Sequence, residues 1–247
     1  MLRLVAFDLD ATLVDFLRVK RLSSDAAALA MVDAGLPLDA AAATERLWQT
    51  YREHGLDGDV AFERFLASVD SLKPAILHAG LRAYLHAKDG ALAPYPRTVP
   101  TLLSLVRRGL SLAIVTDAPS AKAHHRLAAT GLAPFFDEVV TADDTPAGKA
   151  DERPFRLLLS RLGVEAKESL MVGDHPLRDV RSARRAGFAT ALAAYGTQGP
   201  VPIDEDAAPD FSLRRIDDLL GVVDRLMGDS AGAGRANNPT RSVPETR

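Results

Sequence analysis

The sequence predicts an α/β fold, a Rossmann-like, doubly wound parallel sheet with a small α-helical domain inserted into it. Short apolar runs recur along the chain, at residues 2–7, 110–115, 137–142, 169–173 and 189–194. Helix-periodic segments such as SAKAHHRLAATGL and ERPFRLLLSRLGV separate the later runs. Continuous apolar strands that alternate with helices are typical of a parallel sheet covered on both faces.

The segment from residue 16 to residue 92 breaks this alternation. It is rich in Ala and Leu, and helix-period patterns recur within it at residues 24–34, 41–54, 59–70 and 73–88. One crossover helix needs far fewer residues, which argues against the alternative of an ordinary long connection. We therefore predict a helical cap at 16–92 and a Rossmann-like core formed by residues 1–15 and 93–227.

The C-terminal stretch 228–247 is small, polar and proline-containing, with little apolar material to bury. Such a composition is typical of disorder, so we predict a disordered tail.

Composition excludes several classes of protein. The chain has 247 residues, a net charge of −3 and no cysteine. This charge gives no reason to expect a nucleic-acid or acidic-membrane partner, and a thiolate metal site is excluded. No signal peptide and no apolar run of membrane-spanning length is evident. We expect a cytoplasmic protein, a monomer or a homodimer.

Polar side chains follow three of the predicted strands where each strand ends. Ligands of an open parallel sheet bind at the carboxyl ends of its strands, so these side chains are expected at one edge. Each alone has an ordinary interpretation as a helix cap or a turn former. The set comprises Asp8, Asp10 and Thr12 after the first strand, Thr116 and Asp117 after the second, Asp174 and Asp179 after the fourth, and Lys149 in a loop.

Taken together, these residue types indicate phosphoryl-transfer chemistry. Clustered carboxylates need a cation, and hard oxygen ligands suit Mg²⁺. A hydroxyl, a lysine and backbone N–H groups at a helix start suit a phosphate group. A spare carboxylate can then move a proton.

Four ordered motifs resemble those of the haloacid dehalogenase superfamily. AFDLDATLVD matches the first, a strand followed by DxDxT, and IVTDAPS matches the second. GKADERPF is similar to the third, and MVGDHPLRDVRSARRAG matches the fourth. The resemblance covers roughly residues 1–220. It departs from the usual pattern at Ala11, where Gly is common, and at Ala150 and Glu152, which replace two prolines after the motif lysine.

The resemblance implies roles for the carboxylates. Asp8 would be the nucleophile that forms an aspartyl-phosphate, and Asp10 the general acid and then base. Asp8, the backbone carbonyl of Asp10 and Asp174 would bind Mg²⁺. Asp179 would support the metal shell directly or through water or Lys149.

The remaining motif residues would serve the phosphoryl group. Thr116, Lys149 and the backbone N–H of Asp117 would hold its oxygens and offset the charge of the transition state. Thr12 would order the loop after Asp10. Lys149 stands in the motif that departs most from the family pattern.

The resemblance implies Mg²⁺-dependent hydrolysis of a phosphate monoester of a small metabolite. Asp10 favours phosphate chemistry over dehalogenation, because a halide leaves without a proton. The insertion between the first and second motifs resembles the helical-cap subclass, whose members mostly act on small phosphometabolites. Two alternatives stay open: a phosphomutase acting on a sugar phosphate, and a non-catalytic or phospho-receiver-like module.

Overall fold

The structure is a computed structural model that describes residues 1–54, 60–145, 147–197 and 205–233. The chain divides into two compact units. The core unit comprises residues 1–13, 95–127 and 131 onward, and the helical unit comprises residues 14–94 and 128–130. None of the helices in the described ranges is long and apolar enough to cross a membrane.

The core unit is built on a parallel six-stranded sheet with the order β3-β2-β1-β4-β5-β6. The predicted α/β class with a parallel sheet is therefore confirmed. β1 is central, and its last residue, Phe7, lies opposite Ile114 of β2 and Val172 of β4. Because of this register, the residues that follow β1, β2 and β4 emerge side by side. The strands are β1 (Leu4–Phe7), β2 (Ser111–Val115), β3 (Glu138–Val140), β4 (Ser169–Gly173), β5 (Ala189–Ala193) and β6 (Phe211–Leu213).

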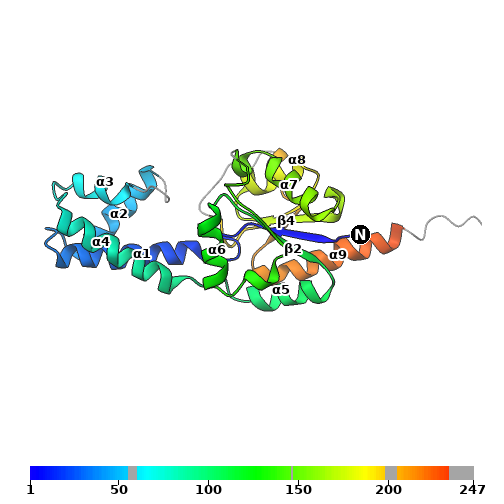
Figure 1. Cartoon of the computed structure of the whole chain (residues 1–247), viewed down its shortest axis with the longest axis horizontal. Helices are drawn as coiled ribbons and strands as arrows, with labels where there is room; N and C mark the ends of the chain where they lie inside the picture. The colour runs from blue at the N-terminus through cyan, green and yellow to red at the C-terminus, as the bar shows by residue number, and fades with distance from the viewer. Residues whose placement is uncertain (55–59, 146, 198–204, 234–247) are drawn as a thin grey trace, which may run out of the picture. The chain divides into compact units, whose positions relative to one another are not determined.

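Helices cover both faces of this sheet (Figure 1). α7 (Arg153–Leu162) and α8 (Ser182–Arg185) lie on one face, and α5 (Thr98–Arg107) and α9 (Leu219–Ala233) on the other. On the α7 face, Phe155 packs edge-on against Phe188 in a core cluster that includes β-strand side chains. The sheet is thus enclosed by apolar layers, which explains why its strands read as continuous apolar runs.

Short irregular turns link these elements, several of them next to strand ends. A π-helical turn spans Pro176–Arg181 and leads into α8, while α6 (Ser120–Ala129) follows β2. The 3₁₀ turns are Ala133–Phe135, Gly148–Ala150, Ala166–Glu168, Glu205–Ala207 and Ile216–Asp218.

Two C-terminal features differ from the sequence-based prediction. The edge strand β6 was not predicted, because only three residues form it and they are not a continuous apolar run. The predicted disordered tail is wrong for residues 228–233, since α9 continues to Ala233. Once a helix is nucleated, each further residue adds a hydrogen bond, so small polar residues can extend it. Residues 234–247 lie outside the described residues.

The helical unit contains α1 (Phe16–Asp33), α2 (Ala40–His54), α3 (Ala61–Ala67) and α4 (Pro74–Ala91). Its own core includes Met31, Leu47, Phe65 and Ile76. α1 and α4 pack so closely that a Cβ at Gly80 would collide with Met31.

The first helix of this unit begins well before the predicted residue 24. Asp15 caps α1 by accepting a hydrogen bond from the backbone N–H of Arg18 at 3.1 Å. The first turns of α1 bury the polar residue Lys20, whose Nζ donates to the Tyr84 hydroxyl at 3.1 Å and lies 3.9 Å from the Tyr51 ring centroid. A buried lysine hides the apolar periodicity by which helices are recognised in a sequence.

Candidate active site

The carboxyl edge of the sheet carries a buried cluster of three carboxylates. Asp8 follows β1, Asp174 follows β4, and Asp179 lies in the π-helical turn behind β4. One carboxylate oxygen from each lies within 4.8 Å of the others. The structure therefore brings together the two strand-end acids predicted as metal ligands and the acid predicted to support them.

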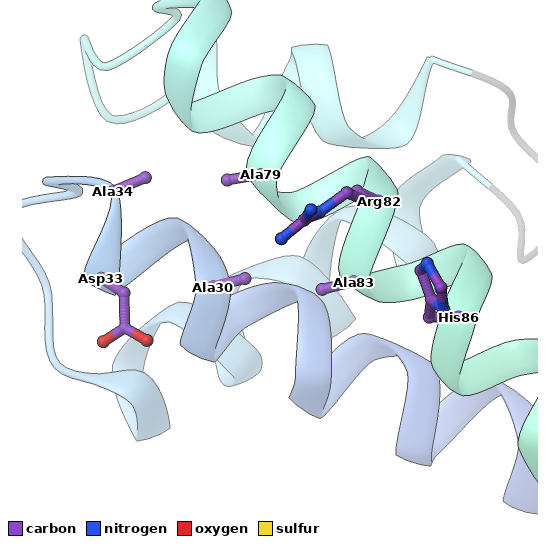
Figure 2. A pocket seen from close by; sticks show the side chains of 7 residues that line it. All are labelled: Ala30, Asp33, Ala34, Ala79, Arg82, Ala83 and His86. Carbon is purple, nitrogen blue, oxygen red and sulfur yellow. The ribbon is translucent and has the colours of Figure 1, made fainter.

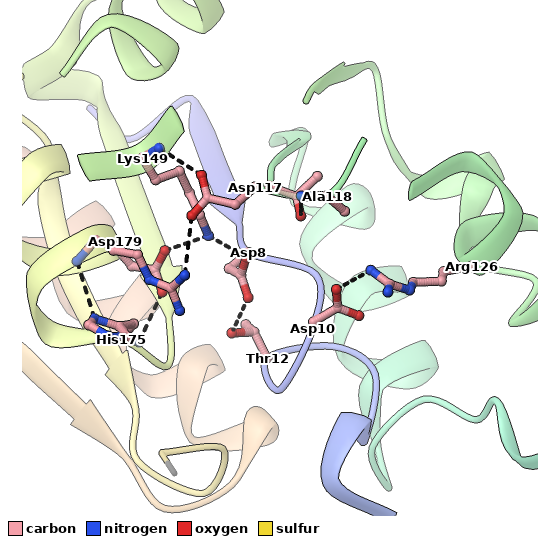
Figure 3. A network of polar contacts seen from close by, with 11 residues as sticks. Asp8, Asp10, Thr12, Asp117, Ala118, Arg126, Lys149, His175 and Asp179 are labelled. Carbon is pink, nitrogen blue, oxygen red and sulfur yellow. Dashed lines mark hydrogen bonds and ion pairs between the residues drawn. The ribbon is translucent and has the colours of Figure 1, made fainter. Parts of the chain in front are cut away.

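Lys149 lies within this carboxylate cluster (Figure 3). Its Nζ donates to Asp8 and, at 2.6 Å, to Asp179, and the residue is only 4% exposed. Because little solvent screens ion pairs as buried as these, the charge of each partner strongly affects the other. The departures at Ala150 and Glu152 thus leave Lys149 in contact with the predicted nucleophile.

The loop that carries Lys149 is held by Asp117. The Asp117 carboxylate accepts the backbone N–H of Lys149 at 2.7 Å and pairs with the Arg178 guanidinium at 3.5 Å. Gly148 adopts a left-handed φ of 58°, and a Cβ there would approach Asp117 to 2.7 Å. Only the backbone N–H of Asp117 was assigned a role from the sequence, so the anchoring by its side chain was missed.

The Asp179 side chain packs against the backbone of residues that precede it. Its carboxylate accepts the N–H of His175 at 2.9 Å, and a Cβ at Gly173 would collide with it. The glycine of the fourth motif is therefore needed for this close approach. Residues 176–181 form a π-helical turn and α8 begins only at Ser182, so Asp179 stands in the turn that precedes the α-helix.

The electrostatics of the cluster favour an additional cation. Burial, together with repulsion from neighbouring carboxylates, raises the pKa of Asp8 to about 7 and that of Asp174 to about 8. Burial by itself would lower the pKa of Lys149, but the carboxylates of Asp179 and Asp8 outweigh it and raise that pKa. The cations that act on these acids, Lys149 and, at Asp174, Arg178, do not offset the effects that raise the two pKa values. The all-oxygen donor set fits Mg²⁺.

The loop of the first motif is held by residues that sequence reasoning missed. Thr12 donates its hydroxyl to Asp8 at 3.2 Å, while its carbonyl accepts the Tyr195 hydroxyl at 2.7 Å. Gly196 lies so close that a Cβ would collide with the carbonyl oxygen of Ala11, which itself has a left-handed φ of 63°. The only sequence signal was that Tyr195 and Gly196 closely follow the fifth apolar run, at the same sheet edge.

Thr116 lies at the end of β2, where a phosphoryl group was predicted to bind. It is buried, and its hydroxyl oxygen accepts the backbone N–H of Ala118 at 3.1 Å. This contact closes a turn between β2 and α6.

Asp10 does not join the carboxylate cluster. Its side chain is directed away from Asp8 and forms an ion pair with Arg126 of α6 (Figure 3). Arg126 is 7% exposed and lies on the same helix as the buried Ala123 and Leu127. Sequence reasoning did not select Arg126, since an arginine within a helical pattern usually lies on the solvated face.

A separate groove of about 680 Å³ lies within the helical unit, between α1 and α4 (Figure 2). Four alanines line it together with Asp33, Arg82 and His86. None of these seven residues was predicted as a site residue.

Comparison with known proteins places these motifs in a family context. A model of the haloacid dehalogenase-like hydrolase family matches residues 2–187, a range that contains every predicted site residue. The chain is 30% identical over 230 residues to a glyceraldehyde 3-phosphate phosphatase of Methanocaldococcus jannaschii, covering 93% of this chain and 100% of that protein. It is 32% identical over 233 residues to a protein of the same name from Methanopyrus kandleri, with 93% and 100% coverage.

A solved structure shows the same fold. A protein of Haemophilus somnus, described as a predicted phosphoglycolate phosphatase, superposes with a TM-score of 0.65 at 27% identity. The match covers 90% of this chain and 98% of that protein. The similarity therefore extends over both units of the chain.

Proposed function

Because this chain belongs to the haloacid dehalogenase-like hydrolase family, we propose that it is a Mg²⁺-dependent phosphatase in which Asp8 is the nucleophile. The observation that carries the proposal is the buried cluster of Asp8, Asp174 and Asp179 with Lys149 among them. The predicted hydrolysis of phosphate monoesters is confirmed by relatives that are named as phosphatases.

The first chemical step transfers the phosphoryl group to Asp8. A carboxylate oxygen of Asp8 forms a bond to phosphorus while the bond to the ester oxygen breaks, and Asp10 protonates the departing oxygen. Thr116 and the following backbone N–H groups hold the phosphoryl oxygens, and Lys149 offsets their charge.

The second step restores the enzyme by hydrolysis of the aspartyl-phosphate. Asp10, now ionised, takes a proton from a water molecule whose oxygen attacks phosphorus, and the bond to Asp8 breaks. Inorganic phosphate leaves, and Asp10 holds the proton needed for the next cycle.

Two carboxylates and one carbonyl of the chain are suited to coordinate the metal ion, and a third carboxylate is suited to support them. Asp8, Asp174 and the backbone carbonyl of Asp10 would coordinate Mg²⁺, with Asp179 supporting them directly or through Lys149 or water. When bound, the ion supplies positive charge that offsets the carboxylates and the phosphoryl oxygens.

The substrate class proposed is a phosphate monoester of a short metabolite. Glyceraldehyde 3-phosphate is the first compound to test, because two relatives that match nearly the whole chain are named glyceraldehyde 3-phosphate phosphatase.

The experiment is phosphate release from p-nitrophenyl phosphate, with Mg²⁺ and with EDTA, followed by a panel of phosphometabolites. Asp8→Asn should reduce release by about 10³-fold or more, because no nucleophile remains. Asp224→Asn, which changes an exposed acid on α9, is the matched control and should retain activity. Isomerisation of a sugar phosphate without phosphate release would identify a mutase instead, and one stable phosphorylation per chain would identify a receiver-like module.

A further inference from the structure

The Asp10–Arg126 ion pair directs the predicted acid and base away from the nucleophile. Asp8 turns toward Lys149, whereas Asp10 turns toward α6 and Arg126 (Figure 3). Asp8 attacks the phosphorus atom, and Asp10 has to protonate the ester oxygen bonded to that same atom. The Asp10 carboxylate therefore has to point toward the bound phosphoryl group, as Asp8 does. The observed position therefore withdraws Asp10 from the reaction.

We propose that Arg126 is a positioning residue that holds Asp10 in this withdrawn position, so that each catalytic cycle requires the ion pair to open. The proposal rests on the proposed function, because it concerns the residue that moves the proton. In chemical terms, the reaction rate is proportional to the fraction of molecules in which Asp10 has left Arg126.

The partners differ in how readily each can move. Arg126 is 7% exposed on a helix, and burial restricts its guanidinium. The Asp10 side chain is 24% exposed and stands in the loop after β1. Rotation of this short side chain about its Cα–Cβ bond would open the pair without moving α6.

The charges nearby support a role for Arg126 that is separate from the cluster. Lys149 pairs with Asp8 and Asp179, and Arg178 pairs with Asp117. Arg126 pairs with Asp10, so its removal changes the position of the acid and base without removing a charge that contacts the nucleophile.

The kinetic test compares Arg126→Met, which keeps the length of the apolar stem, with Arg126→Lys, which keeps the charge. Single-turnover cleavage is measured with the alkyl phosphate that wild type cleaves fastest, since an alkoxide leaves only when protonated. Arg126→Met should accelerate this step about fivefold, and Arg126→Lys should stay near wild type. The first-step burst with p-nitrophenyl phosphate should not change in Arg126→Met, because its leaving group needs no proton.

The double variant shows whether Arg126 acts through Asp10. In an Asp10→Asn background, adding Arg126→Met should have no further effect on alkyl phosphate cleavage. Arg161→Met, which breaks ion pairs with Glu138 and Asp144 elsewhere in the core unit, is the control and should leave both rates unchanged. A slower or unchanged alkyl phosphate step in a folded Arg126→Met would overturn the proposal.

A structural measurement tests the proposal even where turnover is absent. Crystal structures of wild type and Arg126→Met with Mg²⁺ should show Asp10 paired with Arg126 only in wild type and turned toward Asp8 in the variant. The same Asp10 position in both would refute the withdrawal. If wild type releases no phosphate from any compound, the proposed function fails separately, and this comparison still decides the role of Arg126.

Discussion

Replacing Lys149 by methionine removes the ammonium group that pairs with two members of the buried carboxylate cluster. Its Nζ contacts Asp8 and lies 2.6 Å from Asp179, and all three acids have oxygens within 4.8 Å of one another. Methionine keeps most of the apolar stem, so the change isolates the charge. Without metal and without this ammonium group, the carboxylates repel each other more strongly.

The magnitude follows from the burial of the pair. Removing one partner of a buried ion pair costs about 3–5 kcal/mol, and in a chain of this size each kcal/mol shifts the melting temperature by about 2–4 °C. We therefore expect Lys149→Met in EDTA to melt about 10 °C below wild type. Turnover with Mg²⁺ should fall by about 10²–10³-fold, since a donor to the transferred phosphoryl group is lost.

Thermal unfolding in EDTA and in Mg²⁺, combined with phosphate release, is the assay. Mg²⁺ should raise the melting temperature of Lys149→Met more than that of wild type, because the variant's cluster lacks its ammonium group. Lys167→Met removes an exposed lysine that pairs with Glu165 at 2.7 Å, and it serves as the control with almost no change expected. Melting of Lys149→Met within 2 °C of wild type in EDTA, or turnover within about tenfold of wild type, would refute the reasoning.

Three further predictions concern other parts of the site. Asp10→Asn should slow cleavage of alkyl phosphates by about 10²–10⁴-fold in a steady-state assay, and near-normal turnover would contradict its acid and base role. Gly196→Ala should melt below wild type, because its Cβ would collide with the first-motif loop, whereas Gly221→Ala, with open space around it, should be neutral or stabilising by up to about 1 kcal/mol. In EDTA, denaturant unfolding should show stability falling as the pH rises from about 4 to about 8. The raised pKa values of Asp8, about 7, and Asp174, about 8, mean that the folded state favours their protonated forms, which are lost through this range. For Asp8 alone this rise corresponds to about 4 kcal/mol, and Mg²⁺ should abolish most of the dependence. A flat profile in EDTA would show that the cluster does not repel as inferred.

The sequence predicted the sheet and the acids that follow its strands. Apolar runs at residues 2–7, 110–115 and 169–173 contain β1, β2 and β4, and the register brings Asp8, Thr116 and Asp174 to neighbouring strand ends. These features were predictable for two reasons. An apolar run is a local feature of the sequence, and residues that follow parallel strands meet at one edge in any such sheet. The roles assigned to these residues remain predictions.

The helical unit shows where local patterns were insufficient. The sequence indicated four helical patterns between residues 16 and 92, but the start of α1 was displaced because Lys20 is buried against Tyr51 and Tyr84. Burial of a charged side chain depends on partners far along the chain. The periodicity of apolar residues within one helix gives no information about those partners.

The contacts around the site were decided by tertiary structure. The sequence by itself determined which residues follow each strand at the carboxyl edge of the sheet, because the end of each apolar run marks the end of a strand. It did not determine that Asp117 would anchor the Lys149 loop, that Asp10 would turn toward Arg126, or that Tyr195 would support Thr12. These contacts join side chains separated by long stretches of sequence, and they exist only because the folded sheet brings its loops together and buries their charges.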